Sequence, residues 1–223
     1  MSDIQLHTTL LALPLFLGMS RSDIADVVSQ TKFGFMRFGR SKTIISEGDV
    51  CDSIYILING IISTTSRADD NSYSLTETIH APTVIQPERI FGLTQRYSLT
   101  VVALSACNFI RLSKTEILRL SEQYEIFRLN LLNIISTQGQ RIARLPWHPK
   151  PKDIHSKIIR FFISHCQRPV GTKTFNIKME TLATEIGESR LNVSRELNRM
   201  HDSGLIQITR GIIHIPAIEK LRN

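Results

Sequence analysis

The sequence predicts an α+β fold made of a β-rich N-terminal region, one long helix and a small C-terminal domain. Short runs of β-forming residues, separated by turn signals, fill residues 33–112. A regular apolar repeat without proline then covers residues 114–144, as expected for a helix. Three prolines between 146 and 151 stop that helix, because proline lacks an amide donor and clashes with the preceding turn. The expected boundaries are 1–113 for the β domain with its N-terminal helices, 114–145 for the long helix, 146–152 for a hinge and 153–223 for the C-terminal domain.

The β-rich region alternates between strands and turns. One β-forming run ends at Asn59-Gly60, a pair that strongly favours a tight turn, and the next run begins directly after it. Asp69-Asp70-Asn71 is another turn signal. Many short strands at such intervals indicate an all-β sandwich or barrel. The strands expected from these patterns cover residues 53–58, 61–65, 99–104 and 109–112.

The long helix carries two apolar faces. A helix of about 30 residues is about 45 Å long, and two apolar faces along it need two partners. One partner is its own β domain, and we predict that the other is the same helix of a second copy; the alternative is one broad stripe facing the core of a monomer. The heptad-spaced face, predicted as the homodimer interface, consists of Ile117, Leu120, Tyr124, Phe127, Leu131 and Ile134. The other face consists of Leu118, Ile126, Leu129, Leu132 and Ile135.

Positive charge is concentrated in the C-terminal third of the chain. The whole chain has a formal net charge of +7, and residues 148–223 hold 13 Lys and Arg against 7 Asp and Glu. Residues 1–147 are nearly neutral, with 14 basic and 13 acidic residues. A domain that is basic on its own is typical of nucleic-acid binding, although a merely soluble basic domain has the same composition.

The sequence disfavours several other classes of protein. No apolar run reaches the length of a membrane span, and the N-terminus lacks the basic region and cleavage site of a signal peptide, so we expect a cytoplasmic protein with no membrane partner. The three cysteines are far apart and the seven histidines show no metal-ligand spacing, so we expect no disulfide framework, iron–sulfur cluster or other metal. No phosphate loop or convergent catalytic set occurs, so we expect neither catalytic residues nor a cofactor.

Residues 179–200 are predicted to form a helix-turn-helix. Gly187 allows a tight turn between two short helices, and Ser189 is a favourable N-cap for the second. The buried face of the first helix consists of Leu182, Ala183 and Ile186, and that of the second consists of Val193, Leu197 and Met200. The opposite face of the second helix presents Arg190, Asn192, Ser194, Arg195 and Arg199. Arginine and asparagine recognise guanine and adenine edges in the major groove, so this face suits DNA.

A β-hairpin is expected after the second helix, with Arg210 at its tip. The combination is a winged helix-turn-helix with double-stranded DNA as its partner; a helical hairpin with a solvated basic face is the alternative. We predict that Arg190 and Arg195 contact bases, because they lie early in the recognition helix. The other predicted contacts are supporting ones from Ser189, Asn192 and Ser194 and phosphate contacts from Arg199 and Arg210.

With these features the chain resembles the cyclic-nucleotide receptor/fumarate-nitrate regulator (Crp/Fnr) family of bacterial transcription regulators over nearly its full length. The residues that carry the resemblance are Pro14-Leu15-Phe16-Leu17, Ser46-Glu47-Gly48-Asp49, residues 54–60, and Gly187-Glu188-Ser189-Arg190 with Val193 and Arg195. The resemblance implies a β-roll sensor domain of the cyclic-nucleotide-binding, jelly-roll type, a dimerisation helix and a winged-helix domain. It also implies RNA polymerase as a partner and a small-molecule effector of unknown identity in the β-roll.

The sequence departs from the family where cyclic AMP binds. Aligned on Thr100-Val101, the candidate effector pocket consists of Glu88, Arg96, Tyr97, Ser98 and Thr100. Pro87 replaces the family's glycine and removes an amide donor, and Tyr97 replaces its arginine. Arg96 lies one position early, which in a strand-like segment turns its side chain to the other face. We therefore predict that cyclic AMP does not bind usefully.

The function that we predict is a sequence-specific, DNA-binding transcription regulator that acts as a homodimer. Leu191 stands where many relatives have a glutamate that would accept from cytosine, so the DNA site should differ from theirs. The alternative is a small-molecule or nucleotide sensor in which DNA binding is secondary or lost.

Overall fold

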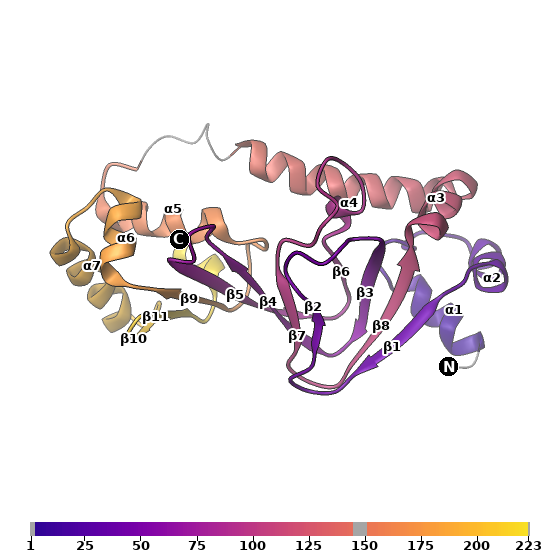
Figure 1. Ribbon diagram of the computed structural model, residues 1–223, viewed down its shortest axis with the longest axis horizontal. Helices are drawn as coiled ribbons and strands as arrows, with labels where there is room; N and C mark the ends of the chain where they lie inside the picture. Colours follow the sequence, from indigo (N-terminus) through magenta and orange to yellow (C-terminus); the bar gives the residue numbers. More distant parts are fainter. Residues whose placement is uncertain (1–2, 145–150, 223) are drawn as a thin grey trace. The chain divides into compact units, whose positions relative to one another are not determined.

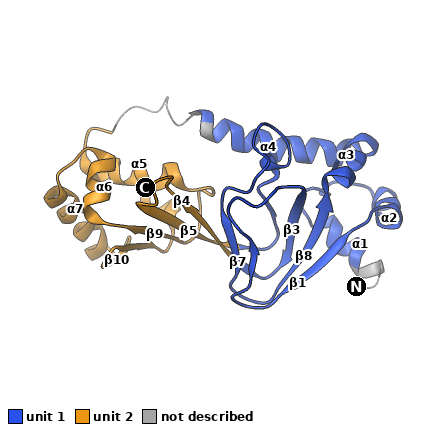
Figure 2. Cartoon of the chain, viewed as in Figure 1, with its two compact units in different colours: residues 1–62, 80–144 blue, residues 63–79, 145–223 orange. Residues whose placement is uncertain are grey.

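The computed structural model of the protein describes residues 3–144 and 151–222 (Figure 1). The chain forms two compact units, which we call unit 1 (residues 1–62 and 80–144) and unit 2 (residues 63–79 and 145–223) (Figure 2). Most of the hinge predicted at 146–152 lies outside the described residues. Within the described ranges, no helix is both long enough and apolar enough to cross a membrane.

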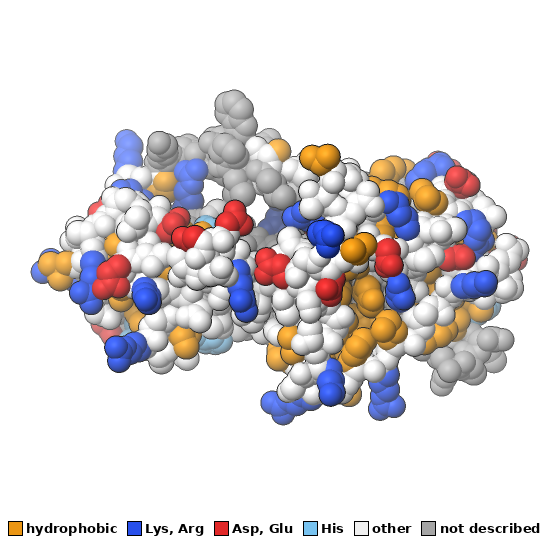
Figure 3. Space-filling view, viewed as in Figure 1, with side chains coloured by type: hydrophobic (Ala, Val, Ile, Leu, Met, Phe, Trp, Pro, Cys, Tyr) orange, Lys and Arg blue, Asp and Glu red, His pale blue; other side chains and the backbone are white. Residues whose placement is uncertain are grey.

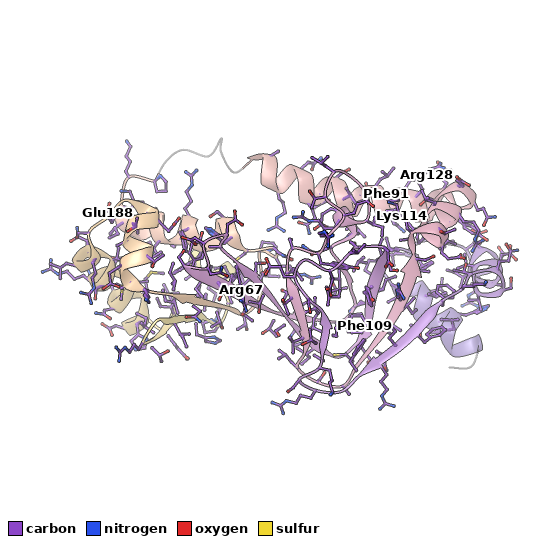
Figure 4. All side chains as sticks on the ribbon, viewed as in Figure 1. Arg67, Phe91, Phe109, Lys114, Arg128 and Glu188 are labelled. Atoms are coloured by element: carbon purple, nitrogen blue, oxygen red, sulfur yellow. The ribbon has the colours of Figure 1, made fainter. Side chains whose placement is uncertain are left out.

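Unit 1 is a β-roll with helices on either side of it in sequence. Its elements are α1 (Asp3–Leu11), α2 (Arg21–Gln30), β1 (Gly34–Phe38), β2 (Thr43–Ile45), β3 (Ser53–Asn59), β6 (Thr83–Ile85), the short 3-10 helix η1 (Pro87–Arg89), β7 (Thr100–Ala103), β8 (Cys107–Ser113), α3 (Lys114–Gln123) and α4 (Glu125–Arg144). One antiparallel sheet has the strand order β1-β8-β3-β6, and β2 pairs with β7. The strands predicted at 53–58, 99–104 and 109–112 are confirmed as β3, β7 and β8, and Phe109 is buried in the core (Figure 4).

The predicted turn at Asn59-Gly60 is confirmed and depends on glycine. Gly60 has a φ of +102°, and a Cβ atom there would lie 2.5 Å from the Ala106 carbonyl oxygen and 2.7 Å from Cys107 Sγ. No L-residue with a side chain fits this position without moving the neighbouring backbone.

The prediction of a single long helix over 114–145 is wrong, because the structure has two helices with a break at Tyr124. This residue has an extended backbone, with φ −123° and ψ 107°, and it ends α3. The Arg128 guanidinium donates to the Ser121 carbonyl oxygen over 3.2 Å, where a continuous helix would place a backbone amide. Arg128, which is labelled in Figure 4, thus stabilises the break by satisfying a carbonyl at the end of α3.

The two apolar faces of α3 and α4 are the reverse of those predicted. Ile117, Leu120 and Phe127 are fully buried in unit 1 itself, and the Phe127 ring packs 5.3 Å from that of Phe16. Leu131 is also buried, whereas Tyr124 and Ile134 are half-buried. The heptad-spaced face therefore belongs to the core of unit 1. The residues that remain exposed are Leu118, Ile126, Leu129 and Leu132, each with 39–52% of its surface accessible.

Unit 2 is a small sheet packed against helices. Its elements are most of β4 (Ile61–Arg67), β5 (Tyr73–His80), α5 (Ile154–His165), β9 (Lys173–Ile177), α6 (Met179–Ile186), α7 (Arg190–Asp202), β10 (Gln207–Thr209), β11 (Ile212–Ile215) and the 3-10 helix η3 (Ile218–Arg222). Strands β10, β11, β9, β5 and β4 lie side by side in that order. The helix-turn-helix (α6 and α7) and the wing (β10 and β11) are confirmed.

Two strands of unit 2, most of β4 and β5, come from the β-rich part of the sequence, whereas the prediction assigned that part to the N-terminal domain. The β4–β5 hairpin turns at the predicted signal Asp69-Asp70-Asn71, and β5 pairs antiparallel with β9 from Tyr73↔Ile177 to Glu77↔Lys173. Leu75, on β5, is 4% exposed and lies in the hydrophobic core of unit 2. The core of the C-terminal unit is therefore completed by residues 63–79, outside the predicted boundary of 153–223.

Candidate nucleic-acid interface

The turn between α6 and α7 has the geometry that the sequence predicts. Gly187 has left-handed backbone angles (φ 66°, ψ 44°), and its N–H donates to carbonyl oxygens at the end of α6. The Ser189 hydroxyl accepts from the Asn192 N–H over 3.2 Å, which confirms Ser189 as the N-cap of α7. These two residues fix the angle at which α7 follows α6.

Helix α7 is anchored by its apolar face. Val193 and Leu197 are fully buried and Met200 is 1% exposed, in a cluster that also contains Phe162 of α5 and Phe175 of β9. Two further contacts join α7 and its N-terminal turn to α5. His155 Nδ1 lies 2.8 Å from Glu196 Oε1, and Lys157 pairs with Glu188, which is labelled in Figure 4. The opposite face of α7 is thereby held outward on a rigid support.

The outward face of α7 contains most of the predicted DNA-contacting residues. Lys and Arg side chains are prominent over the α6 and α7 end of unit 2 in Figure 3. Ser194 is half-buried; the exposed members are Ser189, Arg190, Asn192, Arg195 and Arg199. The structure adds two exposed residues that were not predicted as contacts, Leu191 and Asn198. The sequence identified Leu191 only as a departure from the family. Its spacing relative to Val193 and Leu197 could have predicted its outward position.

The arginines of this face differ in their intramolecular partners. Arg190 Nε lies 3.2 Å from Glu180 Oε1 on α6, and Arg199 Nη1 lies 3.5 Å from Glu196 Oε2. Both arginines are more than two-thirds exposed, so each pair contributes less than about 1 kcal/mol and is readily exchanged for another anion. Arg195 makes no ion pair or hydrogen bond with the described residues, so its guanidinium is available to a ligand.

The wing places Arg210 at the tip of a short antiparallel hairpin. Gln207↔His214 and Thr209↔Ile212 pair across it, and Arg210-Gly211 forms the turn. The hairpin is fixed to the sheet because β11 pairs with β9 and Ile213 is buried. Arg210 is exposed and makes no ion pair within 3–144 and 151–222, as a phosphate contact requires.

In the candidate effector pocket, polar groups are already bonded to other parts of the protein. Gln86, which was not predicted, is 7% exposed and has an unusual φ of 38°. Its Nε2 donates to Ser98 Oγ over 2.7 Å, and its Oε1 accepts from the Ser98 N–H over 3.0 Å. Thr100 Oγ1 accepts from the Glu47 N–H over 3.2 Å. The local sequence gives no sign that a glutamine side chain fills this position.

Two other residues of the candidate pocket, Tyr97 and Arg96, also have hydrogen-bond partners within the protein. The buried Tyr97 hydroxyl donates to the Ser53 carbonyl oxygen over 2.6 Å, and Arg96 Nη1 donates to the Gly48 carbonyl oxygen over 2.7 Å. Burial raises the pKa of Glu88 above the usual carboxyl value. Beside this loop, Lys114 Nζ lies 5.0 Å from the centre of the Phe91 ring (Figure 4). The five predicted pocket residues thus lie around one loop, but four of them have internal partners.

No cluster of His, Cys, Asp and Glu among the described residues could hold a metal ion. Cys51, Cys107 and Cys166 are all buried.

Comparison with known protein families assigns both units. A model of the cyclic nucleotide-binding domain matches residues 35–124, and a model of the Crp-like helix-turn-helix domain matches residues 156–223. The chain belongs to the Crp/Fnr family of transcription regulators. The resemblance carried by the sequence motifs is therefore confirmed, as is the fold class of a β-roll followed by helices and a winged helix-turn-helix.

Individual relatives of this Crp/Fnr chain are distant. It is 22% identical over 180 residues to the cAMP-activated global transcriptional regulator Vfr of Pseudomonas aeruginosa. The aligned region covers 77% of this chain and 84% of Vfr. The catabolite activator protein of Thermus thermophilus has a similar structure, with a TM-score of 0.50 and 18% identity over 94% of this chain and 96% of that one. The sensor domain of the regulator DNR from Pseudomonas aeruginosa has a TM-score of 0.53 and 16% identity, covering 68% of this chain and 98% of that one.

Proposed function

We propose that this Crp/Fnr protein regulates transcription by binding double-stranded DNA at specific sequences through α7 and the wing. The observation that carries the proposal is the outward face of α7, where the Arg195 guanidinium has no partner among the described residues and lies on a helix whose other face is buried. Arginine donates to guanine O6 and N7 in the major groove, and rigid support keeps that contact selective. In this proposal Arg190 and Arg195 contact bases, with Ser189, Asn192 and Ser194 beside them, and Arg199 and Arg210 contact phosphates.

The protein acts as a homodimer in this proposal, through the exposed face of α3 and α4. That face presents Leu118, Ile126, Leu129 and Leu132 over several helical turns. Ile126, Leu129 and Leu132 lie on successive turns of α4, and Leu118 lies on α3 before the break. Exposed apolar residues of this kind favour pairing with the same residues of a second copy, because a two-fold interface is self-complementary. Two winged helices in such a dimer are expected to bind half-sites about one helical turn of DNA apart.

We also propose that cyclic AMP is not the effector. Vfr is described as cAMP-activated, but in this chain Tyr97 bonds Ser53 where the family has a phosphate-binding arginine. Gln86 Oε1 accepts from the Ser98 N–H, which leaves that donor unavailable to a phosphate, and Gln86 Nε2 donates to Ser98 Oγ. Any effector of this protein has a different chemistry from a cyclic nucleotide.

The experiment that tests the proposed function is selection of DNA from a random duplex pool by the purified full-length protein. Enrichment of one inverted repeat supports the proposal. Retention of unrelated sequences without enrichment contradicts specific binding. The alternative function, a sensor with secondary DNA binding, is tested on the same sample by thermal-shift screening against nucleotides: stabilisation by a nucleotide without any sequence enrichment favours that alternative.

A further inference from the structure

Leu191 is an apolar residue at the centre of a polar helix face. Its surface is 59% exposed, and it is not among the residues packed against the core of unit 2. Arg195 and Asn198 follow it at spacings of four and three residues, so the three side chains form one line along α7. That line lies opposite the buried residues Val193 and Met200. Leu191 therefore occupies the most outward position of the first turn of α7.

Because Leu191 does not pack into the core, we consider which group of a ligand its side chain could contact. An aliphatic side chain cannot accept or donate a hydrogen bond, so it recognises neither phosphate nor the polar edge of guanine, adenine or cytosine. The major groove offers one apolar group, the C5-methyl of thymine. The neighbouring Arg190 side chain is directed to Glu180 on α6 in the free protein and leaves Leu191 accessible.

We propose that Leu191 recognises a thymine C5-methyl group, and that each half-site of the DNA contains a thymine whose methyl group is read in this way. This proposal rests on the proposed DNA-binding function and names one base that the protein recognises. Because Arg195 lies one helical turn further along the same line, this thymine is close to the guanine that Arg195 contacts.

The first experiment removes the methyl group alone. Each thymine of the selected DNA is replaced in turn by uracil, and the affinity of the full-length protein is measured by fluorescence anisotropy. Burial of one methyl group corresponds to about fourfold in Kd. We expect one thymine per half-site to show a loss of about this size, and the other thymines to show little change.

The second experiment assigns that loss to Leu191. The Leu191→Ala variant keeps a strong helix-forming residue at an exposed position, so its stability should equal that of the wild type. We expect it to bind the thymine and uracil duplexes equally. The Leu191→Glu variant should instead prefer cytosine at this position, since a carboxylate accepts from the cytosine amino group. With the wild type, 5-methylcytosine placed at the same position should bind more tightly than cytosine.

The outcomes separate the two proposals. Selective binding without sensitivity to uracil at any thymine overturns the role of Leu191 and leaves DNA recognition intact. Equal uracil sensitivity in the wild type and in Leu191→Ala also overturns it, because another residue or the stiffness of the DNA then accounts for the effect. Failure to select any sequence overturns the proposed function itself, and the Leu191 proposal with it.

Discussion

Lys173 Nζ lies 2.8 Å from Glu77 Oε1, although the two side chains are 0% and 2% exposed. The pair joins β9 to β5, which are separated by about a hundred residues in sequence. Glu77 also accepts from the Gln167 N–H over 3.0 Å, and Lys173 donates to the Val170 carbonyl oxygen over 2.8 Å. Both buried charges are thus satisfied. The winged-helix unit thus includes a hairpin from the β-rich part of the chain.

Replacing Glu77 with glutamine should strongly destabilise the protein. The substitution leaves the Lys173 ammonium buried without a counter-charge, which costs about 3–5 kcal/mol. The measurement is the free energy of unfolding in urea. The matched control is Asp52→Asn, which breaks the exposed pair between Asp52 and Arg111 and should cost less than about 1 kcal/mol.

A second variant tests whether charge is the cause of this loss. Glu77→Leu combined with Lys173→Met removes both charges, and it should recover most of the stability lost in Glu77→Gln. Similar stability of Glu77→Gln and the wild type would contradict the buried position of this pair.

Dimerisation is expected to depend on the exposed face of α4. Leu129→Glu places a charge on that face and should give folded monomers in light scattering with unchanged circular dichroism, because Leu129 is 44% exposed. Phe127→Glu should instead prevent folding, because Phe127 is fully buried. A Leu129→Glu protein that remains dimeric at micromolar concentration would show that this face is not the interface.

The half-buried carboxyl of Glu88 should make stability depend on pH. Burial raises the pKa of Glu88 above its usual value of 4.5, so the folded state holds this proton at a pH where the unfolded chain has lost it. The contribution to stability is complete below 4.5 and is lost as the pH rises through the folded-state pKa. Glu88→Gln removes this loss, so the difference in free energy of unfolding, variant minus wild type, should increase with pH above 4.5. A difference that is constant from pH 4 to 8 would contradict a raised pKa.

Cyclic AMP should show no useful binding in isothermal titration calorimetry, because the Tyr97 and Ser98 groups already have partners within the protein. The control ligand is cyclic GMP, which shares the cyclic phosphate and should also fail. Micromolar affinity for either nucleotide would show that the loop of residues 86–98 rearranges to accept a phosphate.

Local patterns were sufficient to predict the helix-turn-helix and the wing. Gly187, Ser189 and Arg210-Gly211 act through their own backbone and cap geometry, so their roles can be read within a few residues. Residues whose role depends on distant neighbours were mispredicted or missed. Phe127 and Leu129 are both large apolar residues in repeats along the same segment, and tertiary packing, such as that of Phe127 against Phe16, determines which face is buried. Likewise, no local signal shows that Glu77 meets Lys173 or that Gln86 bonds Ser98.

The central claim is that α7 reads DNA sequence, and anisotropy titrations of the selected duplex, its single-base variants and unrelated DNA at several salt concentrations test it most directly. We expect Arg195→Ala, and likewise Arg190→Ala, to lose about 1–3 kcal/mol on the selected duplex and to relax the preference at one base pair per half-site. Arg210→Ala should weaken binding to every duplex alike and reduce the salt slope by about one. Equal loss of affinity on all sequences for Arg190→Ala and Arg195→Ala would contradict the account, because both arginines would then be phosphate contacts.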